Sequence, residues 1–462
     1  MTSEQLGSAG PAAACNRDVG LVLAGGGARG AYEIGALSML MPALEQRGER
    51  PGIVLGTSIG ALNGAYLAAT AHLPARESIT GGIDTWRNVD YDDLLSPLLS
   101  AGELSRLLLY FGELLGVPRA KVPSLLDTAP LGDTVRGIIA FDQLARNVKD
   151  GVLAAAAVVA TSYATAESVV FHHSGSSRRL ADDAKRAIRY VPTRLGDEHV
   201  QASAAIPVVF PAIHVGKPRS AAGWYGDGGT RLNTPIKPAL KLGARRVVVI
   251  GLNSSVVPNE HVTGRPDVFD GAAQFLQALL ADQLAQDVAT LTTVNRQLET
   301  RRAPRGARPA GDEHDPVPYI FIAPSDRLTV GRLAAKVYRE QFSSLRAKAR
   351  SRDLAALGHI VSAGDNPVRG ELFSFLFFAR EFIDALIDLG RQDAERWLAT
   401  RHDDGPWRLG EPPRPGVRAA RVRGATRPSR PPPRPDTPEV KTPLRPATGL
   451  PEPVRCDAAP PG

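Results

Sequence analysis

Short apolar runs alternate with amphipathic segments over the first half of the chain. Val19–Ala24 and Pro51–Gly56 are apolar runs of strand length, and a glycine-containing turn follows each of them. Apolar residues at helical spacing come next, over Ala31–Leu40, before Pro42, and over Gly60–Ala71. This alternation predicts an α/β fold whose sheet is largely parallel. Further strands, with helices between them, are predicted at Val152–Tyr163, Ser168–His173 and Arg245–Asn253.

The second half of the chain has a different pattern, in which apolar residues recur every three to four positions. This spacing begins near Val262 and predicts helices, as do the segments from Val330 and from Leu372. The stretch Arg301–Asp315 is rich in arginine, proline and glycine and predicts an exposed loop. Beyond about Asp404 the sequence holds too much proline and arginine to build a core. We therefore divide the chain into a disordered leader (1–17), an α/β domain (18–260), a helical C-terminal region (261–403) and a disordered tail (404–462).

Composition and charge are those of a globular protein with a basic tail. The chain has 462 residues, of which 43% are hydrophobic and 22% charged, and its formal net charge is +7. Much of the positive excess lies in the tail, so the folded part is closer to neutral and no nucleic-acid partner is expected. The two cysteines, Cys15 and Cys456, lie near the termini in sequence that predicts no structure. They indicate neither a disulfide framework nor a cysteine-based metal site.

No segment predicts insertion into a membrane. The first 20 residues lack the basic and apolar regions of a secretory signal. No apolar run reaches the roughly 18 to 20 residues that span a bilayer. We expect a cytoplasmic protein whose contact with membranes is peripheral and transient, and the sequence indicates no particular oligomeric state.

The second predicted strand runs into the sequence Gly56-Thr57-Ser58-Ile59-Gly60, which has the form G-x-S-x-G. A serine on a sharp turn between a strand and a helix presents its hydroxyl clear of the sheet, and small neighbours allow the backbone to turn that tightly. The motif alone is common by chance. Its place between an apolar strand and an alanine-rich helix favours a nucleophile over a plain serine turn.

The glycine-rich segment Gly25–Gly30 lies at the first strand-to-helix turn and is compatible with two kinds of anion site. Its G-x-G-x-x-G spacing is that of a dinucleotide-binding turn, but that turn requires an acid at the end of the second strand, where this chain has Gly-Thr-Ser. A Walker loop is excluded because no Gly-Lys-Ser/Thr follows. The remaining interpretation is that the amides of Gly26, Gly27 and Ala28 point at an anionic oxygen. Beside Ser58, they would form an oxyanion hole.

A serine nucleophile needs a base, and one aspartate stands out where no histidine does. None of the nine histidines has a surrounding sequence that distinguishes it. Asp227 is embedded in glycines, in Gly226-Asp227-Gly228-Gly229, and a polar loop follows it. Taken alone, D-G-G is typical of a simple turn. In combination with the two glycine motifs upstream, it favours a catalytic acid or base.

The segments GGGARG (25–30), GTSIG (56–60) and DGG (227–229), in this order, resemble the patatin-like phospholipase family. The loop ASAAIPVVFP (202–211) before the aspartate supports the likeness, which covers roughly Val19–Leu252. The helical segment LLADQLAQDVATLTTVN (279–295) resembles the C-terminal part of longer bacterial members, which are serine lipid acyl hydrolases. The resemblance implies a three-layer α/β/α sandwich with a central, mostly parallel sheet. It implies no metal and no cofactor.

The resemblance also implies a role for individual residues. Ser58 would be the nucleophile and Asp227 the proton acceptor of a catalytic dyad, which agrees with the lack of a distinctive histidine. Gly229 departs from the alanine that many family members have at that position. The supporting residues would be Gly25, Gly26, Gly27 and Ala28 in the oxyanion hole, Arg29 and Gly30 holding that loop, Gly56 and Gly60 in the nucleophile elbow, and Gly228 and Gly229 in the acid turn.

The expected function is hydrolysis of a phospholipid, lysophospholipid or other acyl ester through an acyl-enzyme. An α/β-hydrolase with a Ser-His-Asp triad is disfavoured because Ser58 follows only the second strand. The other alternative is a regulatory protein that binds a nucleotide or lipid with the glycine-rich loop and does not hydrolyse it. Two leucine-rich stretches, Leu94–Gly116 and Leu372–Gly390, predict amphipathic helices packed on their own domain, with a lid or interfacial helix as the alternative. The basic tail is either solvated or held near anionic headgroups.

Overall fold

The computed structural model describes residues 15–89, 129–177, 179–207, 209–254, 256, 271, 286–300, 315–342, 367–400 and 405–412. The predicted stretch Leu94–Gly116, the loop at 301–314 and the basic tail from residue 413 lie outside these residues, as does most of the predicted leader. None of the described helices is both long enough and apolar enough to cross a membrane.

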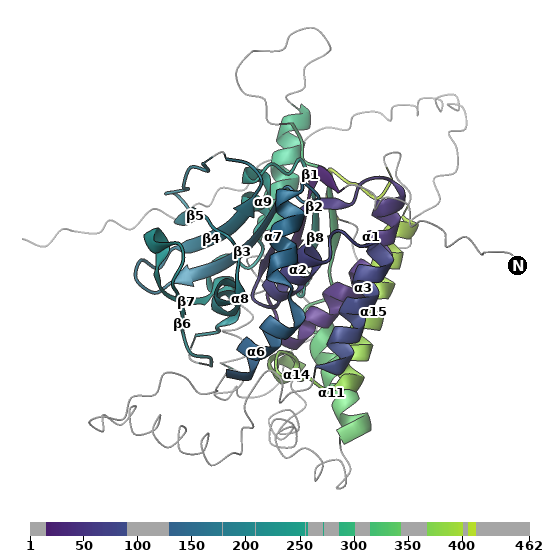
Figure 1. Ribbon diagram of the computed structural model, residues 1–462. Coiled ribbons are helices and arrows are strands. Elements are labelled where there is room, and N and C mark those ends of the chain that lie inside the picture. The colour runs from purple at the N-terminus through teal and green to yellow at the C-terminus, as the bar shows by residue number, and fades with distance from the viewer. Residues whose placement is uncertain are drawn as a thin grey trace, which may run out of the picture. The chain divides into compact units, whose positions relative to one another are not determined.

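A mixed, mostly parallel sheet forms the centre of the fold, as predicted (Figure 1). Its path within the described residues is β5-β4-β3-β2-β1-β8-β9, and the short strands β6 and β7 branch from β3. The five strands from β3 to β9 along this path run parallel, whereas β4 is antiparallel to β3. The strands are β1 (Asn16–Leu23), β2 (Pro51–Thr57), β3 (Ala155–Ser162), β4 (Ser168–Ser174), β5 (Ile188–Pro192), β6 (Ile213–Val215), β7 (Gly223–Asp227), β8 (Arg246–Ile250) and β9 (Tyr319–Ile322).

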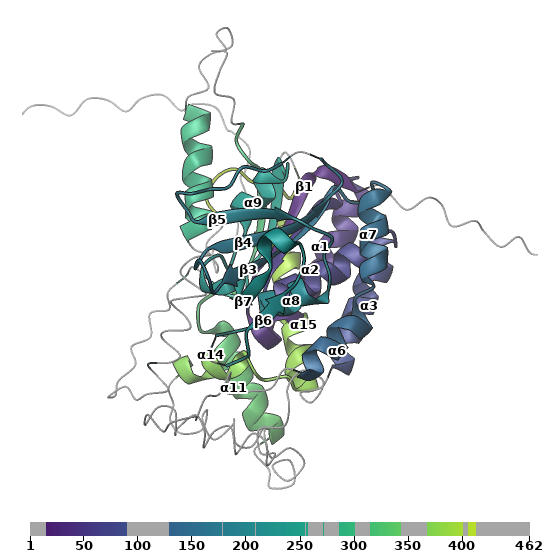
Figure 2. The ribbon, with the colours of Figure 1, turned by 60° about the vertical axis from the view of Figure 1, so that its left-hand side comes forward.

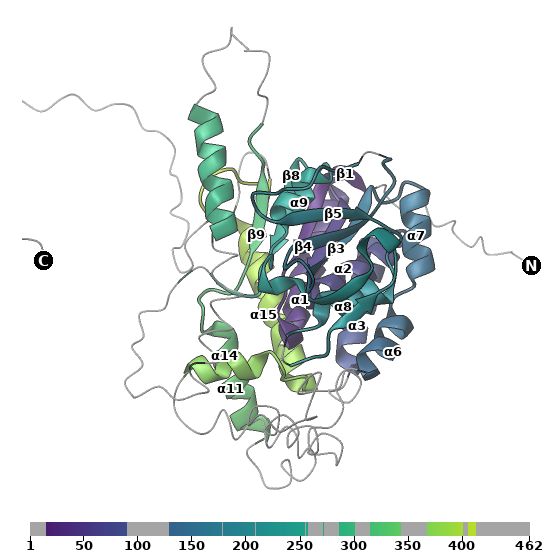
Figure 3. The same ribbon diagram turned by 90° about the vertical axis from the view of Figure 1, so that its left-hand side faces the viewer.

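Helices cover both faces of the sheet, which explains why its central strands are continuous apolar runs rather than alternating ones. On β2, Val54 faces Gly64 of α2, whereas its neighbour Ile53 faces Gly243 at the end of α9. Successive strand residues point to opposite faces, so α2 and α9 lie on opposite sides of the sheet (Figure 3). The helices are α1 (Gly30–Gln46), α2 (Ile59–Ala69), α3 (Ala75–Asn88), α6 (Ala129–Ile138), α7 (Phe141–Lys149), α8 (Asp197–Ala204), α9 (Ile236–Lys241), α11 (Thr329–Phe342), α14 (Pro367–Ser374) and α15 (Arg380–Ala399).

The helical C-terminal region is part of the same fold rather than a separate unit after residue 260. β9 adds a parallel strand beside β8, and α15 lies along α1 (Figure 1). The hydroxyl of Tyr32 in α1 donates a hydrogen bond to Asp393 Oδ2 in α15 at 2.7 Å. α11 and α14 pack on each other (Figure 2). The stretch from Leu372 to Gly390 forms the end of α14, a break and the start of α15, and its phenylalanines are buried, which confirms packing over an interfacial role for this segment.

Several predicted boundaries differ from the structure. β1 begins at Asn16 and Cys15 is buried, so the fold starts inside the predicted leader. α1 runs through Pro42 to Gln46, because residues on both sides of the proline are buried in the core and tertiary packing outweighs its missing hydrogen bond. The predicted tail also begins too early: residues 405–412 belong to the fold, where Arg408 pairs with Tyr319 at the start of β9.

Candidate active site

Ser58 occupies a strained turn between β2 and α2. It has φ 55° and ψ −124°, in the left-handed region that non-glycine residues rarely adopt. The turn is so tight that a Cβ on Gly56 would collide with the backbone carbonyl of Gly60. The backbone at this turn therefore directs the serine side chain away from the sheet, at the carboxyl edge of the parallel strands, where sites in open α/β sheets form.

A buried serine from α8 holds this turn in place. The Ser58 backbone N–H donates to Ser203 Oγ at 2.9 Å, and Ser203 Oγ in turn donates to the Val159 carbonyl of β3 at 2.5 Å. The hydroxyl of Ser203 thus links the Ser58 turn to β3. The Ser58 amide is already bonded and is not available to a substrate oxygen.

Asp227 lies at the end of β7, beside the strand that neighbours Ser58. In the sheet, Asp227 pairs with Ala160, while Thr57 pairs with Val159, so β3 brings the acid and the serine to the same level. The Asp227 backbone N–H donates to the Ala205 carbonyl at 2.7 Å. These backbone hydrogen bonds fix the position of the Asp227 main chain, from which the carboxylate extends.

The carboxylate of Asp227 is almost fully buried, with 3% of the residue exposed. Its Oδ1 accepts the Gly229 N–H at 2.6 Å, while Oδ2 has no partner at hydrogen-bonding distance in the described part of the chain. Burial raises the pKa of Asp227 to about 6, against the hydrogen bonding of the Ser58 side chain and the Gly229 amide, which lower it. The Ser58 side chain is thus near enough to Asp227 to lower its pKa, although Oδ2 accepts no hydrogen bond from the described residues.

The glycine loop, Gly25–Gly30, lies beside this pair. A Cβ on Gly25 would stand 2.9 Å from the Ser58 Cβ. Two of the four predicted oxyanion-hole amides are already used: the Gly25 N–H donates to Asn233 Oδ1 at 2.8 Å, and the Ala28 N–H donates to the Phe375 carbonyl at 2.9 Å. The described residues offer no protein acceptor to the amides of Gly26 and Gly27.

Arg29, a residue of this loop, is buried, with 1% of its surface exposed. Its Nη2 bonds Glu371 Oε2 at 2.7 Å, and its Nη1 bonds Asn253 Oδ1 at 2.5 Å. Burial lowers the pKa of Arg29, and the charge and hydrogen bond of Glu371 oppose that effect. Removing one partner of such a buried pair costs about 3–5 kcal/mol, since the other charge is left uncompensated. Gly30 begins α1 and packs against the side chain of Ile59.

Sequence reasoning missed several residues that support the site. Asn233 lies in the polar loop after the acid turn, and its position six residues beyond Asp227 was its only signal. Ser203 lies in the ASAAIP segment that carried part of the family likeness, but no local pattern indicates its bond to Ser58. Glu371 and Phe375 lie in the C-terminal region, and nothing in the sequence links them to the glycine loop.

No histidine within the described residues takes the place of Asp227. His199 is buried in α8 and bonds the Lys217 carbonyl and the Gly196 amide. His172 is buried in β4, where its ring nitrogens have no partner among the described residues. Burial lowers the pKa of both rings. Neither ring forms a hydrogen bond with Ser58.

Comparison with known proteins identifies the family. A model described as patatin-like phospholipase matches residues 21–240, which include the glycine loop, the serine turn and the acid turn. The segment 21–240, slightly less than half of the chain, therefore belongs to the patatin-like phospholipase family.

A short stretch of the chain is similar to part of a much longer protein. Lysophospholipase nte1 of Aspergillus terreus is 53% identical over 57 residues, which are 12% of this chain and 4% of that protein. The chain therefore spans a small fraction of the curated relative that it matches.

Solved structures with which this patatin-like chain aligns are more distant. VipD from Legionella pneumophila is 16% identical, with a TM-score of 0.28, over 67% of this chain and 62% of that one. Human GIVD cytosolic phospholipase A2 in complex with methyl gamma-linolenyl fluorophosphonate is 12% identical, with a TM-score of 0.35, over 82% of this chain and 57% of that one.

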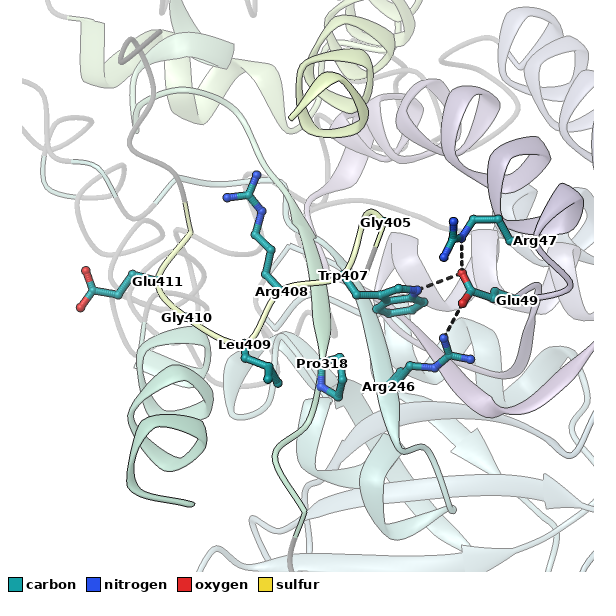
Figure 4. A pocket seen from close by; sticks show the side chains of 10 residues that line it. All are labelled: Arg47, Glu49, Arg246, Pro318, Gly405, Trp407, Arg408, Leu409, Gly410 and Glu411. Carbon is teal, nitrogen blue, oxygen red and sulfur yellow. Dashed lines mark hydrogen bonds and ion pairs between the residues drawn. The ribbon is translucent and has the colours of Figure 1, made fainter. Parts of the chain in front are cut away.

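The patatin-like sheet carries a second polar cluster at its opposite, amino edge. A cavity of about 770 Å³ there is lined by residues from the α1–β2 connection, the starts of β8 and β9, and residues 405–411. Figure 4 shows Arg47, Arg246 and Trp407 converging on Glu49. No residue of this cavity belongs to the site around Ser58.

Among the described residues, no group of three or more histidines, cysteines or carboxylates is arranged to hold a metal ion.

Proposed function

We propose that this protein is a serine lipid acyl hydrolase of the phospholipase or lysophospholipase type that works through a Ser58–Asp227 dyad. The observation that carries the proposal is a serine on a strained turn beside a buried carboxylate whose Oδ2 has no partner among the described residues. A carboxylate with a pKa of about 6 is a better base for a hydroxyl than an ordinary aspartate, and it is still ionised at neutral pH.

In the proposed reaction, Ser58 Oγ attacks the ester carbonyl carbon while Asp227 Oδ2 accepts the hydroxyl proton. The carbonyl oxygen becomes an oxyanion, which the amides of Gly26 and Gly27 stabilise. Collapse of this intermediate breaks the ester bond, and Asp227 returns the proton to the leaving alcohol. Water then attacks the acyl-enzyme, Asp227 accepts its proton, and the fatty acid leaves as Ser58 is regenerated.

We propose acyl-ester lipids as substrates because the matched family is described as a phospholipase family and the relative matched over 57 residues is a lysophospholipase. We propose that the protein meets them at a membrane surface by peripheral contact. The hydrogen bonds of the loop disfavour the nucleotide-binding alternative. The Gly25 and Ala28 amides already donate hydrogen bonds within the protein, which leaves the adjacent N–H groups of Gly26 and Gly27 for a ligand. Two adjacent N–H groups suit one oxyanion better than a chain of phosphates.

The test is covalent labelling of Ser58. Wild-type protein and Ser58→Ala are incubated with a long-chain fluorophosphonate, and intact mass and hydrolysis of p-nitrophenyl acyl esters are measured. We expect one adduct on wild-type Ser58, none on the variant, and loss of hydrolysis with an unchanged melting curve. An unlabelled wild type that hydrolyses no ester would remove the proposal, and the glycine loop would next be tested for binding of nucleotide.

A further inference from the structure

The turn at the end of α14 contacts the glycine loop directly, although the two segments are far apart in sequence. We define the α14 turn as Glu371, Ser374 and Phe375. We propose that this turn sets the geometry of the oxyanion hole and that Glu371 is a positioning residue for ester hydrolysis. The inference rests on the proposed function and assigns to the C-terminal region a part in it.

The first link is made by the backbone of Phe375. Its carbonyl accepts the Ala28 N–H at 2.9 Å. The same carbonyl lies against Gly27, which has φ +60°, and a Cβ at Gly27 would collide with it. The α14 turn thus takes up the Ala28 amide and holds the loop at Gly27, whose own amide has no acceptor among the described residues.

The second link runs through Arg29, the residue after Ala28. Its Nη2 bonds both the Glu371 carboxylate, at 2.7 Å, and the Glu371 carbonyl, at 2.6 Å. Its Nε bonds Ser374 Oγ at 2.8 Å, and its guanidinium lies 4.0 Å from the centre of the Phe375 ring. All three members of the α14 turn therefore hold one side chain of the glycine loop.

The carboxylate of Glu371 is itself anchored from behind. Its other oxygen, Oε1, accepts the Gly331 N–H of α11 at 2.5 Å. Glu371 is buried, with 1% of its side chain exposed. Because α11 holds Oε1 of Glu371, the position of Oε2 is fixed as well. The bond from Arg29 to Oε2 therefore holds the glycine loop in place.

Such an anchor matters for the chemistry because an oxyanion hole works only when its donors lie about 2.7–3.1 Å from the developing charge. A displacement of about 1 Å lowers the rate by about 100-fold. Substrate in its ground state does not yet carry that charge. Loosening the α14 turn should therefore lower kcat and leave KM nearly unchanged.

The main test uses Glu371→Gln, which keeps the shape of the side chain and removes its charge. Asp384→Asn is the matched control, because Asp384 is also a carboxylate of the C-terminal region that pairs with the first half of the chain, through Arg87 at 2.7 Å, and it does not touch the loop. Rates are measured with p-nitrophenyl esters and expressed per Ser58 that fluorophosphonate can label. We expect kcat to fall about 10- to 100-fold in Glu371→Gln, with KM within about threefold, and to stay within about twofold in Asp384→Asn.

Three further readouts separate positioning from a merely structural role. Inhibition by a lipid trifluoromethyl ketone, which forms an oxyanion on binding Ser58, should weaken by about the same factor as kcat/KM falls. The acid limb of the pH profile should stay in place, because Asp227 is unchanged. In an Arg29→Gln background, Glu371→Gln should add less than about a twofold effect, since Glu371 acts through Arg29.

A normal kcat per labelled site in Glu371→Gln would overturn the inference, and so would a lower kcat with undiminished ketone inhibition. If Glu371→Gln fails to fold, Ser374→Ala replaces it. That variant keeps the ion pair and should lose about 3- to 10-fold in kcat, and an unchanged kcat there would also overturn the inference. A wild type that hydrolyses no ester removes the proposed function and this inference together. An active wild type with an unaffected Glu371→Gln removes the inference alone.

Discussion

Asp227 and Glu49 are carboxylates at opposite edges of one sheet, and their surroundings are of opposite kinds. Burial tends to raise the pKa of Glu49, but hydrogen bonds from Arg47, Trp407 and Arg246 together bring it below its ordinary value. Asp227 is more deeply buried, and only neutral groups, the Ser58 side chain and the Gly229 amide, act against that burial, so its pKa rises to about 6. The same chemical group is thus a fixed anion at one edge and, in the proposed mechanism, a proton acceptor at the other.

The difference lies in the partners rather than in the acid. Cations around Glu49 stabilise the ionised form at every pH near neutrality, so that group holds the α1–β2 connection against β8 and residue 407. Neutral donors around Asp227 stabilise the ionised form only weakly. A buried carboxylate that lacks a cation is the environment in which general bases are found.

The largest expected effect is on turnover. Asp227→Asn should lower kcat/KM for an acyl ester by about 10⁴-fold, because the base is lost. Glu49→Gln should leave it within about threefold. Steady-state kinetics on both variants, with melting curves as the folding control, decide the matter. An equal loss of kcat/KM in the two variants would show that Asp227 has no role in turnover that Glu49 lacks.

The next effect is on stability, where the two substitutions should act in opposite directions. The folded-state pKa of Asp227 is raised from 3.8 to about 6, so the wild type bears the cost of the buried charge above pH 6 and is relieved of it as the pH falls toward 4. At pH 8 that cost is about 3 kcal/mol, which sets the upper limit of the stabilisation by Asp227→Asn.

The lowered pKa of Glu49 has the reverse sign. Its contribution is present above its unfolded pKa and is lost as the pH falls. Glu49→Gln should therefore destabilise the protein at pH 8, by about 1 kcal/mol, and less at pH 4. Urea denaturation at pH 8 and pH 4 measures both differences. A less stable Asp227→Asn at pH 8 would contradict the assignment of an unpaired buried charge.

A third effect is the pH dependence of the wild type. Because Asp227 must be ionised to accept a proton, kcat/KM should fall about tenfold between pH 7 and pH 5, with the midpoint of the acid limb near 6. Glu49→Gln should show the same limb. A limb at the ordinary aspartate value would mean that the carboxylate is solvated when substrate is present.

The smallest effect tests whether neutral hydrogen bonds position the site. Ser203→Ala removes the acceptor of the Ser58 amide and leaves Asp227 in place. We expect kcat to fall about fivefold and stability to fall by about 1–3 kcal/mol, the cost of a buried unpaired amide. Ser254→Ala is a control, because Ser254 is a similarly buried serine whose hydroxyl bonds the Ser325 carbonyl and does not contact Ser58. Identical kinetics in the two variants would argue against a supporting role for Ser203.

The sequence predicted those parts of the molecule whose determinants are local. The strand-to-helix turns at Gly25 and Ser58, and the glycine-flanked Asp227, are short patterns in which neighbouring residues dictate the backbone. The features that the sequence did not predict depend on contacts between residues far apart in the chain. Apolar periodicity could not show that β9 joins the sheet beside β8, nor that Cys15 is buried.

The assignment of individual amides could not be predicted either. Gly25 and Ala28 look equivalent to Gly26 and Gly27 in the sequence, and their amides are taken by Asn233 and Phe375, which no local pattern places nearby. The acceptor of the Gly25 amide lies 208 positions away. Long-range hydrogen bonds of this kind decide which donors remain for a substrate.

The bond between Arg29 and Glu371 also has a consequence for how the protein is made. The two residues are separated by 342 positions. During synthesis, Ser58 and Asp227 leave the ribosome long before the α14 turn does, because the chain emerges from its amino end. A nascent chain therefore carries Ser58 and Asp227 before it carries the anchor of its glycine loop, and the site can be completed only after residues 371–375 have been synthesised.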